Sequence, residues 1–200
     1  MNSIMVVIEG LDITGKTTIA KALAERDHWR YYRTPPPPYY EACVKSGVDG
    51  RPVFNEERFL LFLECLKYSS REIAELLKSG ISVVVDRWLW TTLSYHFAFN
   101  PDLEARWREY KNEYEPDLTS PELSILMHVA DKEVYAQRKA SRGKLTELDK
   151  VVLNDEIKSS AIWHNFNRLN PKFLLVDNSG SFESTMKIVL KHVEAVKIQN

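Results

Sequence analysis

The stretch GLDITGKT, residues 10–17, constrains the fold more than any other part of the chain. Its spacing is G-x-x-x-x-G-K-T, with Gly10 and Gly15 followed by Lys16 and Thr17. Glycine reaches left-handed backbone conformations, so the N–H groups of such a loop can point inward and surround a phosphate. The spacing therefore predicts an anion-binding loop, and a loop of this kind must join a strand to a helix.

The segments on either side of the loop fit that requirement. Residues 3–8 form a short β-branched run that predicts a buried strand, and residues 16–26 predict a helix. In this setting Lys16 is placed for the β- and γ-phosphates of a nucleotide, and the Thr17 hydroxyl is placed for Mg²⁺. An ordinary strand-to-helix turn is the alternative. We assign to the phosphates of a nucleotide the loop and the next residue: Gly10, Leu11, Asp12, Ile13, Thr14, Gly15, Lys16, Thr17 and Thr18.

Strands and helices alternate along the rest of the chain. Further strands are predicted at residues 31–33, 81–85, 123–129 and 173–176. Helical spacing predicts helices at residues 55–80, 87–100, 102–113, 132–141, 151–169 and 182–198. Residues 142–150 are polar and are predicted to be irregular. Short strands separated by helices predict an α/β fold with a parallel sheet covered on both faces.

Composition narrows the class of protein. A net charge of -1 over 200 residues gives no electrostatic footprint for nucleic acid. Cys43 and Cys65 are far apart and fit neither a disulfide framework nor a metal site, so we expect two reduced thiols in a cytoplasmic protein. No apolar stretch approaches the roughly 20 residues that a membrane span needs.

A second site is expected where the strand at 81–85 ends, because ligands of parallel sheets bind at the carboxyl edge. Asp86 is a candidate for holding Mg²⁺ through water, and Arg87 for gripping an acceptor phosphate. A surface ion pair is the alternative. A GTPase is disfavoured because no K-x-D occurs, and the D-x-x-G at 177–180 is interpreted as a strand-ending turn.

Six stretches, taken together, resemble one family. IEGLDITGKTT resembles the E-G-x-D-x-x-G-K-T-T of thymidylate kinases, which phosphorylate dTMP to dTDP with ATP. ERFLLF resembles the segment that supplies an aromatic ring to stack on thymine, and DRWLWTTLSY resembles the D-R-[YW]-x-x-S-x-x-A-Y segment. A strand of the family is similar to PDLTSPELSILMHV, and its arginine-bearing lid is similar to RKASRGK. The family's loop beside the ATP base is similar to VDNSGSFE. Their order covers nearly the whole chain.

The resemblance implies a P-loop type three-layer sandwich with a five-stranded parallel sheet, Mg²⁺–ATP as donor, and a homodimer. It implies one nucleotide kinase domain over residues 1–200, with a short mobile lid at about 138–150. Asp12 would contact the 3′-hydroxyl of the acceptor, although Asp also favours turns. Acceptor-binding residues would be Asp12, Phe62, Arg87, Thr91 and Tyr95, metal-binding residues Thr17 and Asp86, and catalytic residues Lys16, Arg142, Asp12 and Arg87.

The chain departs from the family pattern in three places. RTPPPPYY replaces the usual R-E-P segment, and Leu66 stands where an arginine normally reads the base. The loop has Ile13 and Thr14 where other members carry an arginine, so Arg138 or Arg142 of the lid would compensate. A deoxynucleoside kinase, a monophosphate kinase of other base specificity and a non-catalytic P-loop protein therefore stay as alternatives.

Overall fold

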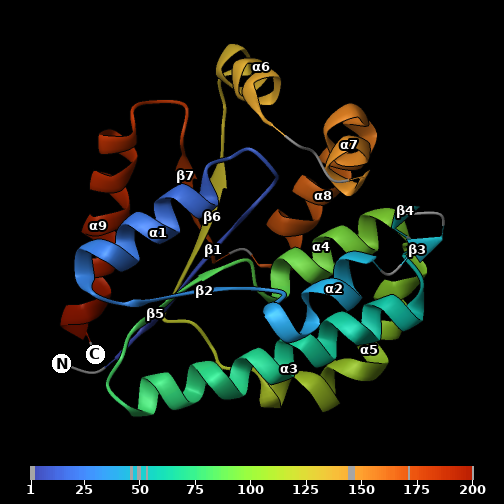
Figure 1. Ribbon diagram of the computed structural model, residues 1–200, viewed down its shortest axis with the longest axis horizontal. Coiled ribbons are helices and arrows are strands. Elements are labelled where there is room, and N and C mark those ends of the chain that lie inside the picture. Colours follow the sequence, from blue (N-terminus) through green and yellow to red (C-terminus); the bar gives the residue numbers. More distant parts are fainter. Residues whose placement is uncertain are drawn as a thin grey trace.

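The computed structural model describes residues 3–45, 47, 48, 51, 52, 54–143, 147–170 and 172–199 (Figure 1). Its main sheet has five parallel strands in the order β2-β5-β1-β6-β7. The strands are β1 (Met5–Gly10), β2 (Arg30–Arg33), β5 (Val83–Asp86), β6 (Leu123–His128) and β7 (Leu174–Asp177). The predicted five-stranded parallel sheet is thus confirmed, and every strand ends at the same edge.

Helices cover both faces of this sheet (Figure 1). The described helices are α1 (Lys16–Asp27), α2 (Pro37–Lys45), α3 (Glu56–Lys78), α4 (Leu89–Phe99), α5 (Asp102–Tyr114), α6 (Lys132–Ser141), α7 (Glu147–Asn154), α8 (Glu156–Leu169) and α9 (Phe182–Gln199). A short 3₁₀ turn, η1 (Glu115–Asp117), follows α5, and a small hairpin joins β3 (Gly47–Val48) to β4 (Arg51–Pro52). Helices and sheet therefore form three layers.

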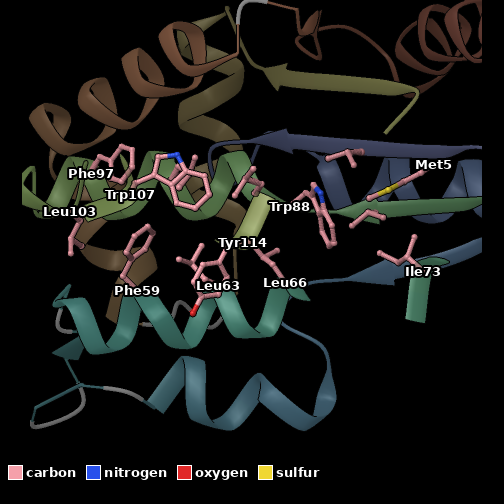
Figure 2. Packing of buried hydrophobic residues seen from close by; sticks show 14 of the residues in the cluster. Met5, Phe59, Leu63, Leu66, Ile73, Trp88, Phe97, Leu103, Trp107 and Tyr114 are labelled. Carbon is pink, nitrogen blue, oxygen red and sulfur yellow. The ribbon is translucent and has the colours of Figure 1, made fainter. Parts of the chain in front are cut away.

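The central strand β1 is buried on both faces, because successive side chains of a strand point to opposite sides. Met5 and Val7 pack with α3, α4 and α5, where Figure 2 shows Phe59 and Leu63 from α3. Ile4, Val6 and Ile8 pack on the other side with α1 and α9. A third cluster joins α4 to α8 through residues such as Tyr95 and Phe166. This packing fixes the strand end from which the phosphate loop departs.

Helix α2 is absent from the sequence-based prediction, which places no element between the strand at 31–33 and the helix that starts at residue 55. Pro37 and Pro38 form the first turn of α2. The first N–H groups of a helix have no intrahelical partner, so a proline there loses no hydrogen bond. The proline run thus ends one element and begins the next, and it returns the chain toward α3.

The region after α6 also differs from expectation. The prediction of irregular structure over 142–150 is wrong from Glu147, where α7 begins, and residues 144–146 of the expected lid lie outside the described residues. The single helix predicted over 151–169 is two helices. Asp155 separates them, because its carboxylate accepts a hydrogen bond from the N–H of Lys158 at 3.0 Å and caps α8. Across the described ranges, no helix is long and apolar enough to span a bilayer.

Candidate active site

A cavity of about 540 Å³ lies at the carboxyl edge of the sheet, where parallel sheets bind their ligands. The phosphate loop forms one wall, and the ends of β2 and β5, helix α6 and the residues after β7 form the others. Four arginines line it: Arg33 at the end of β2, Arg87 directly after β5, and Arg138 and Arg142 in and directly after α6. Such a concentration of guanidinium groups suits phosphate oxygens, which they can bind in a forked geometry.

Two glycines of the loop are required by its geometry. Gly10 has a φ of 139°, and a Cβ at this position would lie 2.3 Å from the carbonyl oxygen of Met127. Gly15 has a φ of 86°, and a Cβ there would lie 2.3 Å from the Nδ2 atom of Asn178. The loop can therefore approach β6 and the segment after β7 only because both positions lack a side chain.

Lys16 begins α1 and reaches back over the loop, where its amine donates to the carbonyl oxygen of Leu11. Burial disfavours the charged amine, and the positive charge of Arg87 adds to this effect, so the pKa of Lys16 falls to about 7. A phosphate beside the amine would oppose both effects. Lys16 is therefore a buried amine whose charged form an anionic ligand would stabilise, in addition to the nearby carboxylates.

Asp12 and Arg87 face each other across the cavity and form an ion pair. The hydroxyl of Tyr95 donates to the second carboxylate oxygen of Asp12 at 3.1 Å, and Arg142 lies 3.8 Å from the first. Burial of Asp12 opposes ionisation, yet Arg87, Lys16 and Arg142 together outweigh it and lower the pKa of Asp12 to about 2. The carboxylate inside an anion-binding loop is therefore compensated by cations on the facing walls.

The end of β5 provides a second carboxylate beside the loop. Oδ2 of Asp86 accepts hydrogen bonds from the Thr17 hydroxyl at 2.6 Å and from the Tyr31 hydroxyl at 3.1 Å. Oδ1 of Asp86 is buried and has no hydrogen-bond partner among the described residues. A buried carboxylate oxygen next to a hydroxyl is a donor set that suits Mg²⁺, which prefers oxygen ligands.

The two candidate lid arginines occupy different positions. Arg138, on α6, donates from Nη2 to the main-chain oxygen of Asn178 at 2.7 Å, beside Gly15. Its Nη1 atom is buried without a hydrogen-bond partner within the described ranges. Arg142 lies at the other end of the cavity, between Asp12 and Asp149, with its Nη2 atom 3.4 Å from the latter. Both line the cavity, so the geometry brings two cations from one segment over the loop.

Three of the predicted acceptor residues, Phe62, Thr91 and Tyr95, lie outside this lining, although Tyr95 contacts it through Asp12. Phe62, on α3, contacts the ring of His96 at 5.1 Å and the guanidinium of Arg58 at 5.0 Å. The hydroxyl of Thr91 donates to Glu9. Leu66, at the position of the usual base-reading arginine, is buried in the core. In its place the structure sets Arg58 beside Phe62.

Glu9 is a residue of the site that the sequence-based prediction missed. Its carboxylate accepts from the N–H of Trp88 at 3.1 Å, from the N–H of Thr91 at 3.2 Å, and from the Thr91 hydroxyl. Burial raises the pKa of Glu9 to about 7, against the effect of these hydrogen bonds. The contacts cap the start of α4, directly after Arg87, which has a φ of 73°. Glu9 therefore helps to hold Arg87 in a backbone conformation that few non-glycine residues adopt. The sequence did carry a signal, because Glu9 is the first residue of the E-G-x-D-x-x-G-K-T-T pattern, but no role was assigned to it.

Comparison with known proteins gives one consistent result. A family model described as thymidylate kinase matches residues 8–188. A probable thymidylate kinase of Pyrococcus horikoshii is 31% identical over 210 aligned residues, covering 96% of this chain and 98% of the relative. One from Pyrococcus abyssi is 33% identical over 164 residues, covering 76% of this chain and 77% of the relative. The solved thymidylate kinase of Candida albicans shares the fold, with a TM-score of 0.73 at 19% identity, over 98% of this chain and 93% of that one.

Proposed function

The chain belongs to the thymidylate kinase family, and we propose that its two substrates meet at this cavity, bound by the residues assigned below. The enzyme phosphorylates dTMP to dTDP with ATP as the phosphate donor. One observation carries the assignment of residues: Lys16 of the phosphate loop and the Asp12–Arg87 pair line a single cavity. Donor and acceptor phosphates can therefore meet there for direct in-line transfer.

The donor side is assigned to the loop and the helix that follows it. The residues are Gly10, Leu11, Asp12, Ile13, Thr14, Gly15, Lys16, Thr17 and Thr18, whose backbone N–H groups and helix terminus attract the phosphates of ATP. The Lys16 amine exchanges its contact with Leu11 for the β- and γ-phosphates. It stabilises the charge that develops on the transferring group.

The acceptor side is assigned to the opposite wall. Arg87 grips the phosphate of dTMP, and its existing contact with Asp12 sets its direction. Asp12 accepts a hydrogen bond from the acceptor 3′-hydroxyl, with Tyr95 and Thr91 close to the sugar. Phe62 stacks on the base. No protein nucleophile is needed, because the phosphate oxygen of dTMP attacks the γ-phosphorus.

Mg²⁺ is assigned to Thr17 and Asp86. These residues fit the ion for two reasons. The Oδ1 atom of Asp86 is buried and has no hydrogen-bond partner in the described part of the chain. The Thr17 hydroxyl is close by, because it donates a hydrogen bond to Oδ2 of the same carboxylate. When bound with ATP, the ion would neutralise charge on the β- and γ-phosphates. Asp86 itself orients the Thr17 hydroxyl at the start of α1.

We assign residues 138–150 to a mobile lid of the one kinase domain, with Arg142 as the arginine that stabilises the transferring phosphoryl group. Its place beside Asp12 supports this role, because the acceptor wall lies there. Arg138, beside Gly15, is assigned to the donor phosphates. We also propose a homodimer in the cytoplasm; Cys43 and Cys65 are buried thiols that form no disulfide, which suits a reducing compartment.

The test of function is a coupled assay of ADP release with a panel of deoxynucleoside monophosphates and deoxynucleosides. We expect dTMP to give the highest kcat/KM and thymidine to give no turnover. Turnover of thymidine would indicate a deoxynucleoside kinase. A preference for another monophosphate would indicate a monophosphate kinase of different base specificity. ATP binding without ADP release for any acceptor would indicate a non-catalytic protein.

A further inference from the structure

Asn178 is the first residue after β7, and it joins four separate parts of the molecule. Its main-chain N–H donates to His128 in β6 at 2.8 Å, and its main-chain oxygen accepts from Arg138 in α6 at 2.7 Å. Its side-chain Nδ2 donates to the carbonyl oxygen of Thr14 at 2.9 Å, while Oδ1 accepts from the Thr185 hydroxyl at 2.7 Å. The residue is 6% exposed and lines the cavity.

The orientation of the Asn178 amide follows from its two partners. The carbonyl oxygen of Thr14 can only accept a hydrogen bond, so the group that faces it must be Nδ2. The Thr185 hydroxyl then meets Oδ1 from α9 and fixes the opposite end of the amide. Thr185 is 1% exposed, so no water competes freely for this contact.

The contact with Thr14 determines where the next N–H points. The Thr14–Gly15 peptide is planar and trans, so its C=O and N–H groups point in opposite directions. With the oxygen held by Asn178, the N–H of Gly15 is turned away from Asn178 and toward the open side of the loop. Among the described residues it has no hydrogen-bond acceptor. An N–H group directed in this way is available to a phosphate oxygen.

The missing side chain of Gly15 provides independent support. A Cβ at Gly15 would lie only 2.3 Å from Nδ2 of Asn178, so the glycine and the amide are fitted to each other. Asn178 and Arg138 are the residues that approach Gly15 on this side of the loop. The next atoms near that Cβ position belong to Asn178, at 3.6 Å, and to Arg138, at 3.8 Å.

We propose that Asn178 is a positioning residue for the donor phosphates of ATP. Its side chain fixes the Thr14–Gly15 peptide so that the Gly15 N–H enters the phosphate cradle. Its main-chain oxygen holds Arg138 over the same point. The proposal rests on the proposed function, since it takes the loop to be the site of ATP.

Asn178→Ala tests the proposal, and Asn165→Ala is its matched control. Asn165 is also 6% exposed, and its Nδ2 also donates to a main-chain oxygen, that of Ser94 in α4 at 3.0 Å, rather than to one of the phosphate loop. We expect Asn178→Ala to raise the Kd for ATP about tenfold by calorimetry, as the loss of one hydrogen bond to a charged ligand does. The KM for dTMP should stay unchanged. Asn165→Ala should lower the melting temperature without changing the Kd for ATP.

A second pair of variants acts through Thr185, so the test survives if Asn178→Ala does not fold. Thr185→Val removes the hydroxyl that fixes the amide and should weaken ATP binding, whereas Thr185→Ser should restore it. Wild-type affinity for ATP in both Asn178→Ala and Thr185→Val would overturn the proposal. Equal weakening by Asn165→Ala would overturn it too, because the effect would then be general destabilisation. Failure of the wild-type protein to bind ATP would overturn the proposed function instead.

Discussion

The hydroxyl of Thr17 donates a hydrogen bond to Oδ2 of Asp86 at 2.6 Å, across 69 positions of the sequence. It connects the first turn of α1, which follows the phosphate loop, to the end of β5, which carries Arg87. The distance between the walls that we assign to donor and acceptor is therefore fixed before any substrate binds. Pre-set geometry of this kind lowers the entropic barrier to transfer between two bound substrates.

Asp86→Asn is expected to weaken the response to Mg²⁺. The amide keeps the size of the side chain and an oxygen for Thr17 but loses the negative charge that attracts the ion. We expect a Mg²⁺ titration at fixed ATP to show an activation midpoint higher by on the order of tenfold. Asp177→Asn is the control, since this carboxylate only holds a turn through Ser179 and Ala130. An unchanged midpoint in Asp86→Asn would remove Asp86 from the metal site.

Lys16→Ala is expected to lower kcat by on the order of 10²-fold or more, because one electrostatic stabiliser of the transferring group is lost. The fold should be retained, since Lys16 is a buried cation whose only hydrogen bond in the described structure is to Leu11. Steady-state kinetics, with circular dichroism as a check on folding, would measure both. Turnover at the wild-type rate would contradict the assigned role.

ATP binding is expected to take up a proton at pH 8. Burial and Arg87 lower the pKa of Lys16 to about 7, so at pH 8 the amine is mostly neutral before ATP binds. Phosphate oxygens favour the charged form and raise this pKa, so the amine gains a proton as ATP binds. At pH 6 the amine is already charged and the uptake should vanish. Calorimetry in buffers of different ionisation enthalpy measures the protons taken up. Lys16→Met should show none at either pH, and equal uptake in that variant would assign the proton to another group.

Arg142→Ala is expected to lower kcat by on the order of 10³-fold, as loss of an arginine that stabilises a phosphoryl transition state does. The Kd for ATP should change little, because Arg142 lies beside Asp12 rather than beside Gly15. Arg138→Ala is the matched comparison on the same segment and should mainly raise the Kd for ATP. If the two variants exchange these effects, the roles of the two arginines are reversed.

Asp12→Ala is expected to lower kcat/KM for dTMP by about tenfold to a hundredfold. A hydrogen bond to a charged group contributes roughly 1.5–3 kcal/mol, which corresponds to that range. The KM for ATP should barely change. With 3′-deoxy-dTMP as acceptor, the variant and the wild-type protein should differ little. A variant that binds ATP more tightly and treats both acceptors alike would show that Asp12 only repelled the donor.

The sequence was sufficient for features that depend on neighbouring residues. The spacing of Gly10, Gly15, Lys16 and Thr17 predicted the loop, and the structure places that loop between β1 and α1. The five strands of the main sheet were predicted because short β-branched runs separated by helical spacing leave few alternatives. The helix predicted from residue 55 is α3, and the side chain of Asn55 caps it by accepting from the N–H of Arg58 at 2.9 Å.

The sequence-based prediction of helix boundaries failed where a residue type is compatible with two different structures. No helix was predicted at Pro37 and Pro38, because proline usually breaks regular structure, although it is tolerated in the first turn of a helix. Asp155 was included within a helix, whereas it caps a new one. In both cases the choice depends on how the chain turns in space, and local propensity does not decide that.

Tertiary structure alone decided which side chains meet in the site. Glu9 meets Trp88 across 79 positions, and Asn178 meets Thr14 across 164. Neither pair leaves a pattern in the sequence, because the spacing between the partners depends on every helix that lies between them. The sequence determined a phosphate loop and a parallel sheet, since both arise from short-range backbone geometry. Which residues hold that loop in its active shape was decided by strand order, because parallel strands bring distant segments to the same edge.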